Sequence, residues 1–141
     1  MKIYLSDKTS VNKEYKTFST LPEFNNGVLE GEATSIIVDS FLSKYKISEL
    51  DFVLGVIFDK MRIGSDLTLI EKDMDCLCLK YQRNEIDILE LNQLIRGQAE
   101  EAIGSFLTLE FVLSKLKDNI QVNEKFIQND STFTIKCKRV K

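Results

Sequence analysis

The chain has 141 residues, of which 43% are hydrophobic and 29% charged, with a formal net charge of −3 and a pI near 5.1. These values are typical of one soluble globular domain that can bury a core of its own. They exclude a strongly basic surface of the kind that binds nucleic acid or anionic lipid.

The chain has no histidine and three cysteines, Cys76, Cys78 and Cys137. Without histidine, no Ser-His-Asp or Cys-His arrangement can form within it, so acid–base chemistry would fall to Asp, Glu, Lys or Tyr. An odd cysteine count argues against a disulfide framework, and a zinc site would need carboxylates to complete its ligand set. We therefore predict free thiols and no metal site. With no signal-peptide pattern and no run of about 18 apolar residues, a cytoplasmic protein outside the membrane is expected.

The first residues are predicted to form an N-terminal arm, 1–27, ahead of an α/β domain, 28–141. Apolar and polar residues alternate in Met1–Leu5, which indicates a short strand, and we place it at a sheet edge. The rest of the arm is polar, and its aromatic residues are expected to pack on the sheet or on another chain, although they could stack on a nucleic-acid base. These aromatic residues are Tyr15, Phe18 and Phe24.

The next segment predicts strand, helix and strand. The run Ser35–Val38 is apolar and β-branched, which indicates a strand buried on both faces, as in a parallel sheet. Apolar residues at helical spacing predict a helix over Leu50–Met61, with a capping box that begins at Ser48. Gly64 is expected to end this helix in the left-handed conformation, and residues 66–71 to form the second strand. A crossover of this length favours a right-handed, parallel connection.

Helical spacing returns after a connector of no clear pattern, residues 74–79. It predicts a helix over about 85–95 that Gly97 ends, then a loop or short helical turn over 98–104. A further helix follows, capped by Thr108 or Ser105.

The C-terminus is predicted to be an antiparallel hairpin. Its strands are residues 120–127 and 133–139, and the turn between them is Asn129-Asp130-Ser131. Phe133, Ile135 and Cys137 alternate with polar residues, the period expected of a half-buried strand.

This order of elements resembles the carboxyl half of class I S-adenosylmethionine-dependent methyltransferases. Residues 33–39 look like that family's fourth strand, and residues 54–71 like the following helix, R-x-G turn and fifth strand. Leu91–Gly97 is similar to an L-N-x-x-I-x-G segment of some small methyltransferase-like proteins. Residues 109–116 and 133–139 look like the last helix and the terminal hairpin, with its closing F-x-I-x-x-x-R. The resemblance covers residues 28 to 140.

The cofactor motifs of that family are missing. Its glycine-rich turn follows the first strand, whereas the one close pair of glycines here, Gly27 and Gly31, precedes the first core strand. The residues before Ala33 are too few for three strands with crossover helices, because each such unit needs about 30 residues. The resemblance therefore implies a Rossmann-like α/β fold with a mostly parallel sheet, a C-terminal antiparallel hairpin, helices on both faces and a truncated N-terminal half.

Carboxylates at the ends of the two predicted parallel strands are the candidate site residues. Asp39 stands where the family often places a catalytic or substrate-side acid, or it caps the following turn. Glu71 and Asp73 leave the next strand on the same side and are candidates for binding the cofactor. With Asp75 they could instead hold a cation, but the spacing matches no calcium loop, and solvated charges are the simpler interpretation. The basic tail Lys136–Lys141 could contact phosphate or be the solvated end of a strand.

We predict from this pattern a methyltransferase-like pseudoenzyme that binds no cofactor and acts as a binding or structural subunit. The lost strands would expose a sheet edge beside Ser35–Val38, so we expect a homo-oligomer or a larger protein partner, and neither nucleic acid nor a membrane. One alternative is an S-adenosylmethionine-dependent methyltransferase completed by a partner chain, or by a non-standard pocket beside Asp39 and Glu71. Another is a phage or mobile-element component that uses the fold as an assembly scaffold.

Overall fold

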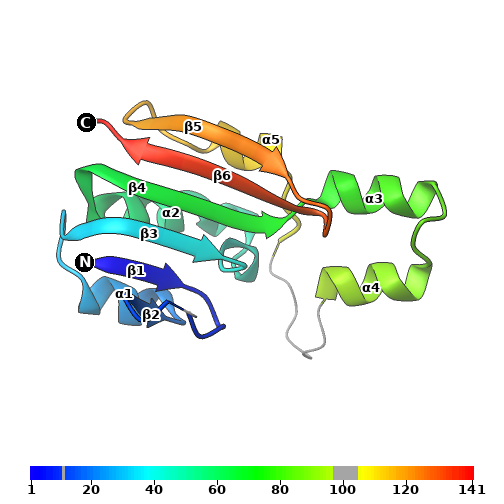
Figure 1. Ribbon diagram of the computed structural model, residues 1–141, viewed down its shortest axis with the longest axis horizontal. Helices are drawn as coiled ribbons and strands as arrows, with labels where there is room; N and C mark the ends of the chain where they lie inside the picture. Colours follow the sequence, from blue (N-terminus) through cyan, green and yellow to red (C-terminus); the bar gives the residue numbers. More distant parts are fainter. Residues whose placement is uncertain (11, 97–104) are drawn as a thin grey trace.

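The computed structural model describes residues 1–10, 12–96 and 105–141, and its centre is a six-stranded sheet (Figure 1). The strand order is β2-β1-β3-β4-β6-β5. The first four strands along the chain are parallel, and β6 is antiparallel to both β4 and β5. The predicted mixed sheet with a C-terminal antiparallel hairpin is confirmed. The strands are β1 Lys2–Leu5, β2 Tyr15–Phe18, β3 Ala33–Asp39, β4 Met61–Lys72, β5 Ile120–Ile127 and β6 Thr132–Arg139.

The N-terminal residues contribute two strands to the sheet. β1 lies between β2 and β3, since Lys2 pairs with Tyr15 on one side and with Ser35 on the other. The prediction that Met1–Leu5 is an edge strand is therefore wrong, because β2 occupies that edge. The edge of β3 beside Ser35–Val38 is covered by β1 rather than exposed. A parallel crossover is expected to contain a helix, whereas residues 6–14 join β1 to β2 without a helix in their described part.

Five α-helices are described: α1 Leu21–Gly27, α2 Leu50–Lys60, α3 Met74–Gln82, α4 Ile88–Arg96 and α5 Leu109–Ser114. Thr108 caps α5 as predicted, and its hydroxyl oxygen accepts a hydrogen bond from the Phe111 amide at 3.2 Å. The capping box at Ser48 is wrong. A 3-10 turn, Ile47–Glu49, precedes α2, and the Glu49 carboxylate accepts from the Lys46 amide at 3.2 Å. The helix predicted over Leu50–Met61 is confirmed as α2, and the capping box before it begins at Lys46 rather than Ser48.

Gly64 lies within β4 rather than at the end of a helix. α2 ends at Lys60, and the chain enters β4 directly at Met61. The left-handed conformation is present, with φ +83° at Gly64, but it serves a bulge: Ala33 pairs with Met61, and Ser35 already pairs with Asp66. The extra residues on β4 need a conformation that glycine adopts without strain.

The hydrophobic core lies on one face of the sheet, under α1, α2 and α5 (Figure 1). Alternate residues of the central strands are completely buried there, such as Ile36 and Val38 on β3 and Leu67 and Leu69 on β4. Their neighbours Ile37, Thr68 and Ile70, which point the other way, are only half-buried. The predictions of helices on both faces and of a strand buried on both faces differ from the structure here.

We call the second face the open face, since no helix in the described ranges lies over it (Figure 1). Strand pairing places small, apolar and charged side chains on it in register. Its residues are Lys2, Tyr4, Ser35, Ile37, Asp39, Asp66, Thr68, Ile70, Thr134, Lys136 and Lys138, with Glu124 and Phe126 of β5 at one side.

α3 and α4 form a hairpin that projects beyond the carboxyl ends of the parallel strands (Figure 1). The segment 74–79, which showed no clear pattern, is the start of α3. The predicted helix over 85–95 is confirmed as α4, where Asp87 accepts a hydrogen bond from the Glu90 amide at 2.7 Å. Gly97 and the loop predicted over 98–104 lie outside the described residues. No described helix has the length and apolar character needed to span a membrane.

Arg139, the last residue of the closing F-x-I-x-x-x-R, ties the C-terminal strand to the end of α2. Its Nη1 donates to the carbonyl oxygens of Phe58 at 2.8 Å and Met61 at 2.6 Å. The Phe58 carbonyl already accepts from the Met61 amide, so Arg139 adds a charge-assisted hydrogen bond there, and a cation at a helix C-terminus also complements the helix dipole.

We expect Arg139→Ala to lower the free energy of unfolding by about 2 kcal/mol, because two charge-assisted hydrogen bonds are lost. Urea denaturation measures the change. The matched control is Lys138→Ala on the same strand, whose ammonium only approaches Asp66 at 3.9 Å and whose loss should cost less than about 0.5 kcal/mol. Equal effects of the two substitutions would show that the capping role is wrong.

Candidate functional site

The carboxyl ends of β1, β3 and β4 meet at one end of the sheet. In open α/β sheets the ligand crevice lies at this end, where the strand order reverses. The reversal falls between β1 and β3, since β1 leads to β2 on one side and β3 leads to β4 on the other. Asp39 is the last residue of β3 and thus stands at this reversal of strand order, which is the switch point of the sheet.

Tyr4 of β1 and Asp39 of β3 form the centre of this site. The Tyr4 hydroxyl donates to Asp39 Oδ2 at 2.6 Å, and the Ser40 hydroxyl donates to Oδ1 at 3.1 Å. The Lys8 ammonium lies 4.0 Å from the same carboxylate. Burial, followed by the hydrogen bond and charge of Asp39, raises the pKa of Tyr4, so the phenol stays protonated and acts as a donor. The Asp39 carboxylate can accept a further hydrogen bond from a polar ligand.

Glu71, predicted to bind a cofactor, faces the interior. Its side chain is 2% exposed, and its carboxylate accepts from the amides of Leu42 at 2.7 Å and Ser43 at 3.3 Å. Burial raises the pKa of Glu71 to about 7, against the opposing effect of these hydrogen bonds. The carboxylate fixes the 3-10 turn Leu42–Lys44 against the end of β4.

Asp73 also has a structural position. Its carboxylate accepts from the amides of Cys76 at 3.1 Å and Leu109 at 3.0 Å, so it serves the N-termini of both α3 and α5. Asp75 is exposed on α3. The three acidic residues from Glu71 to Asp75 therefore do not converge. Across the described ranges, no three His, Cys, Asp or Glu side chains gather as a metal site would require.

The basic tail and the aromatic residues of the N-terminal arm, also candidates from the sequence, make contacts within the protein. In the basic tail, Lys136 pairs with Glu124 at 3.2 Å, and Arg139 holds α2. Phe18 and Phe24 are buried against each other in an edge-to-face pair 5.9 Å apart. The Tyr15 and Ser35 hydroxyls share a hydrogen bond of 3.2 Å. Core packing is confirmed for the two phenylalanines.

Sequence reasoning missed Tyr4, Lys8 and Lys72. Lys72 ends β4, its ammonium donates to the Leu94 carbonyl of α4, and burial, followed by the charge of Lys8, lowers its pKa. Strand register is the signal that could have found Tyr4. Once β1 pairs in parallel with β3, Tyr4 lies on the strand next to Asp39. The thiol of Cys137 is buried, which raises its pKa to about 12 and leaves it unreactive.

Comparison with solved structures identifies the fold. An S-adenosylmethionine-dependent methyltransferase from Methanosarcina mazei matches with a TM-score of 0.56 and 16% identity, over 95% of this chain and 70% of that one. One from Archaeoglobus fulgidus matches with a TM-score of 0.55 and 10% identity, over 91% and 69%. The chain has a class I methyltransferase-like fold.

A further matching structure, also of a methyltransferase, contains a bound ligand. Magnesium protoporphyrin IX methyltransferase from Synechocystis, solved with bound SAH, matches with a TM-score of 0.56 and 10% identity, over 89% of this chain and 50% of that one. The chain spans 59% of the length of one other methyltransferase structure that it matches and 63% of another. No protein-family model and no curated protein matches the sequence.

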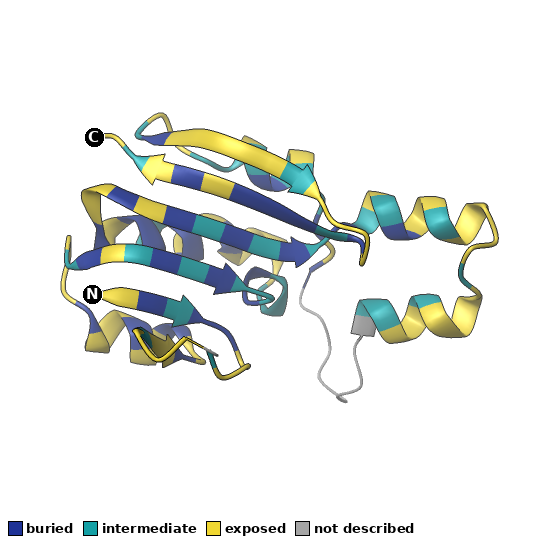
Figure 2. Ribbon diagram, in the orientation of Figure 1, coloured by how far each residue is buried: buried dark blue, intermediate teal, exposed yellow. Residues whose placement is uncertain are grey.

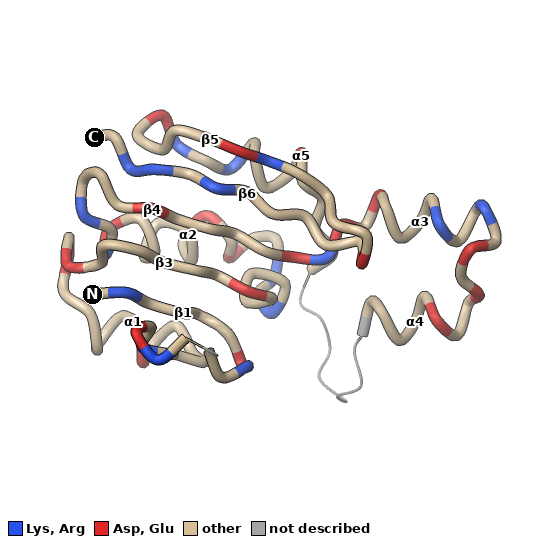
Figure 3. Tube along the Cα trace, viewed as in Figure 1, with Lys and Arg blue, Asp and Glu red and all other residues tan. Residues whose placement is uncertain are grey.

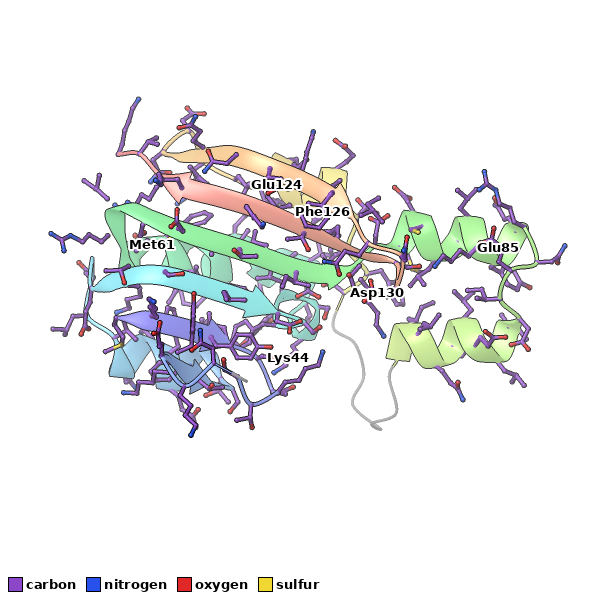
Figure 4. All side chains as sticks on the ribbon, in the orientation of Figure 1. Lys44, Met61, Glu85, Glu124, Phe126 and Asp130 are labelled. Carbon is purple, nitrogen blue, oxygen red and sulfur yellow. The ribbon has the colours of Figure 1, made fainter. Side chains whose placement is uncertain are left out.

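The residues at the methyltransferase-like switch point do not fit S-adenosylmethionine in the usual way. That family's glycine-rich turn would follow β1, yet residues 6–14 contain no glycine. Ser6 is buried, and an ion pair between Lys44 and Asp7 lies beside it (Lys44 is labelled in Figure 4). After β2, where the family places an acid for the ribose, the chain continues with Ser19 and Thr20.

Proposed function

We propose that this methyltransferase-like protein is a binding or structural subunit that does not bind S-adenosylmethionine through its own residues. The observation that supports this most is the end of β1, where a glycine-free connection and the Tyr4–Asp39 hydrogen bond occupy the switch point. A side chain at each position of this connection keeps a cofactor from the close backbone approach that glycine permits.

The open face takes the place of the expected sheet edge as the binding surface. Parallel strands normally have both faces covered, whereas in residues 1–10, 12–96 and 105–141 helices cover only one face of the parallel strands. Half-buried Ile37 and Ile70 lie on its two central strands, and lysines and carboxylates lie around them, as in a protein interface with an apolar core and a polar rim.

Isothermal titration calorimetry with S-adenosylmethionine and with S-adenosylhomocysteine tests the proposal. We expect no saturable heat up to about 1 mM ligand, a limit that corresponds to about 4 kcal/mol of binding free energy. Saturable binding that Asp39→Asn weakens and the exposed-site control Glu124→Gln leaves unchanged would contradict it. An active methyltransferase titrated in parallel shows that the ligand is intact.

A methyltransferase completed by a partner chain is the second candidate. The half-buried Asp39 carboxylate at the switch point favours it, because a partner could supply the glycine-rich turn beside an acceptor that is already in place. The two candidates separate in the same titration: the second predicts cofactor binding only after a partner has been added.

A further inference from the structure

Among the residues that the structure describes, no helix covers the open face, although its sequence and strand direction call for one. Ser35–Val38 is a run of the kind found in strands buried on both faces, yet Ile37 is only half-buried. Ile70 on the neighbouring β4 is half-buried as well. Ser35 and Thr68 beside them are small, so a helix can approach the backbone closely at this place.

The α3–α4 hairpin exposes apolar side chains that could cover such a face. It projects past the sheet with apolar side chains in solvent, and Figure 2 shows α4 largely exposed. Ile88 is 52% exposed and Leu89 72%, and both lie in the first turn of α4. α3 adds Leu79 and Tyr81, also exposed. At nine residues, α4 is about 14 Å long, which fits along about four residues of a strand.

Lysines on the rim of the open face, which also carries Asp39, Asp66 and Glu124, can pair with the acidic start of α4. The start of α4 carries exposed acidic residues, Glu85, Asp87 and Glu90, and the rim of the open face carries exposed Lys2, Lys136 and Lys138 (Figure 3; Glu85 is labelled in Figure 4). These lysines pair within the chain with Glu14, Glu124 and Asp66. Exposed pairs of this kind contribute little and can exchange for pairs across an interface.

The hairpin is held away from the open face of its own chain. Asp73 caps α3, and its carboxylate accepts hydrogen bonds from the amides of both Cys76 and Leu109. The Lys80 ammonium donates to the Asn129 carbonyl at 2.9 Å and keeps α3 against the turn between β5 and β6. α4 therefore lies beyond the end of the sheet (Figure 1).

We propose that a second copy of this chain supplies the cover, so that in a two-fold symmetric dimer α4 of each copy packs on the open face of the other. This inference rests on the proposed function as a binding subunit and names its partner. A two-fold arrangement lets each copy contribute the same two surfaces, which makes the contact reciprocal and closed.

Sedimentation equilibrium of the full chain, with and without substitutions on each surface, tests the dimer. We expect the wild type to dimerise, and Leu89→Lys on α4 and Ile70→Lys on the open face each to raise the dissociation constant at least about 30-fold. Leu29→Lys is the matched control: Leu29 is 74% exposed between α1 and β3, on neither surface, and its replacement should leave the dimer unchanged. Circular dichroism checks that each variant folds, and Leu89 is exposed enough for its variant to do so.

Mixing the two variants distinguishes reciprocal exchange from other dimers. The Leu89→Lys copy keeps an intact open face and the Ile70→Lys copy keeps an intact α4, so a mixture should associate more tightly than either variant alone. A wild type that is monomeric, or a dimer that Leu89→Lys leaves intact, would overturn the proposal. Neither result bears on cofactor binding, so this inference and the proposed function fail separately.

Discussion

Replacement of Leu69 by alanine should lower the free energy of unfolding by about 3 to 5 kcal/mol. Leu69 of β4 is completely buried between Val38 of β3 and Ile135 of β6, which are also completely buried. Both cross-strand neighbours belong to the sheet, so the space cannot collapse without a shift of strands, and a cavity remains.

The next residue on the same strand is the matched control. Ile70 points to the open face and is half-buried, so Ile70→Ala should cost about 1 kcal/mol in dilute solution. Urea denaturation at low and high protein concentration gives both values. Equal losses at the two positions would show that the core does not lie on one face. A cost at Ile70 that grows with concentration is expected if a second copy covers that face.

The second large effect concerns pH and Glu71. Its folded-state pKa of about 7 lies above the ordinary value of 4.5, so the folded protein holds this proton more tightly than the unfolded chain. The stabilisation is complete below about pH 4.5 and is lost as pH rises through 7. From the two pKa values the loss is at most about 3 kcal/mol. The chain has no histidine, so few other groups titrate in this range.

Glu71→Gln should remove this dependence. Glutamine stays neutral and can still accept from the Leu42 amide, so the variant should match the wild type near pH 5 and exceed it near pH 8. Urea midpoints across pH 5 to 8 measure the difference, with Glu124→Gln, an exposed carboxylate, as the control. Parallel pH profiles for the wild type and Glu71→Gln would show that Glu71 is not the titrating group.

The sheet could be predicted where strands carry their own pattern. Alternation in Phe133, Ile135 and Cys137 predicted β6, because burial of one face selects every second residue. The continuous apolar run Ser35–Val38 predicted β3. β2 could not be found this way. Its four residues, Tyr15–Phe18, have one buried side chain, and their place depends on pairing with β1. Parallel pairing without a crossover helix leaves no periodic signal in the connection.

Only part of the candidate site could be predicted, because the rest also depends on contacts between distant segments. Asp39 follows from its position at the end of a recognisable strand. Tyr4 depends on the register between β1 and β3, and the inward direction of Glu71 depends on the amides of Leu42 and Ser43, which come from a turn with no sequence pattern of its own. Long-range register and backbone donors are set by the assembled sheet, so local composition does not encode them.

The hairpin of α3 and α4 leaves and rejoins the domain at one place. The Met74 amide donates to the Leu107 carbonyl at 2.9 Å, and Asp73 accepts from the Leu109 amide at 3.0 Å, so the two ends of this excursion are tied together. Closing an excursion costs entropy that grows only slowly with its length. Insertions, deletions or exchanges between these anchor points can therefore alter what the domain recognises while β4, α5 and the hydrophobic interior keep their contacts.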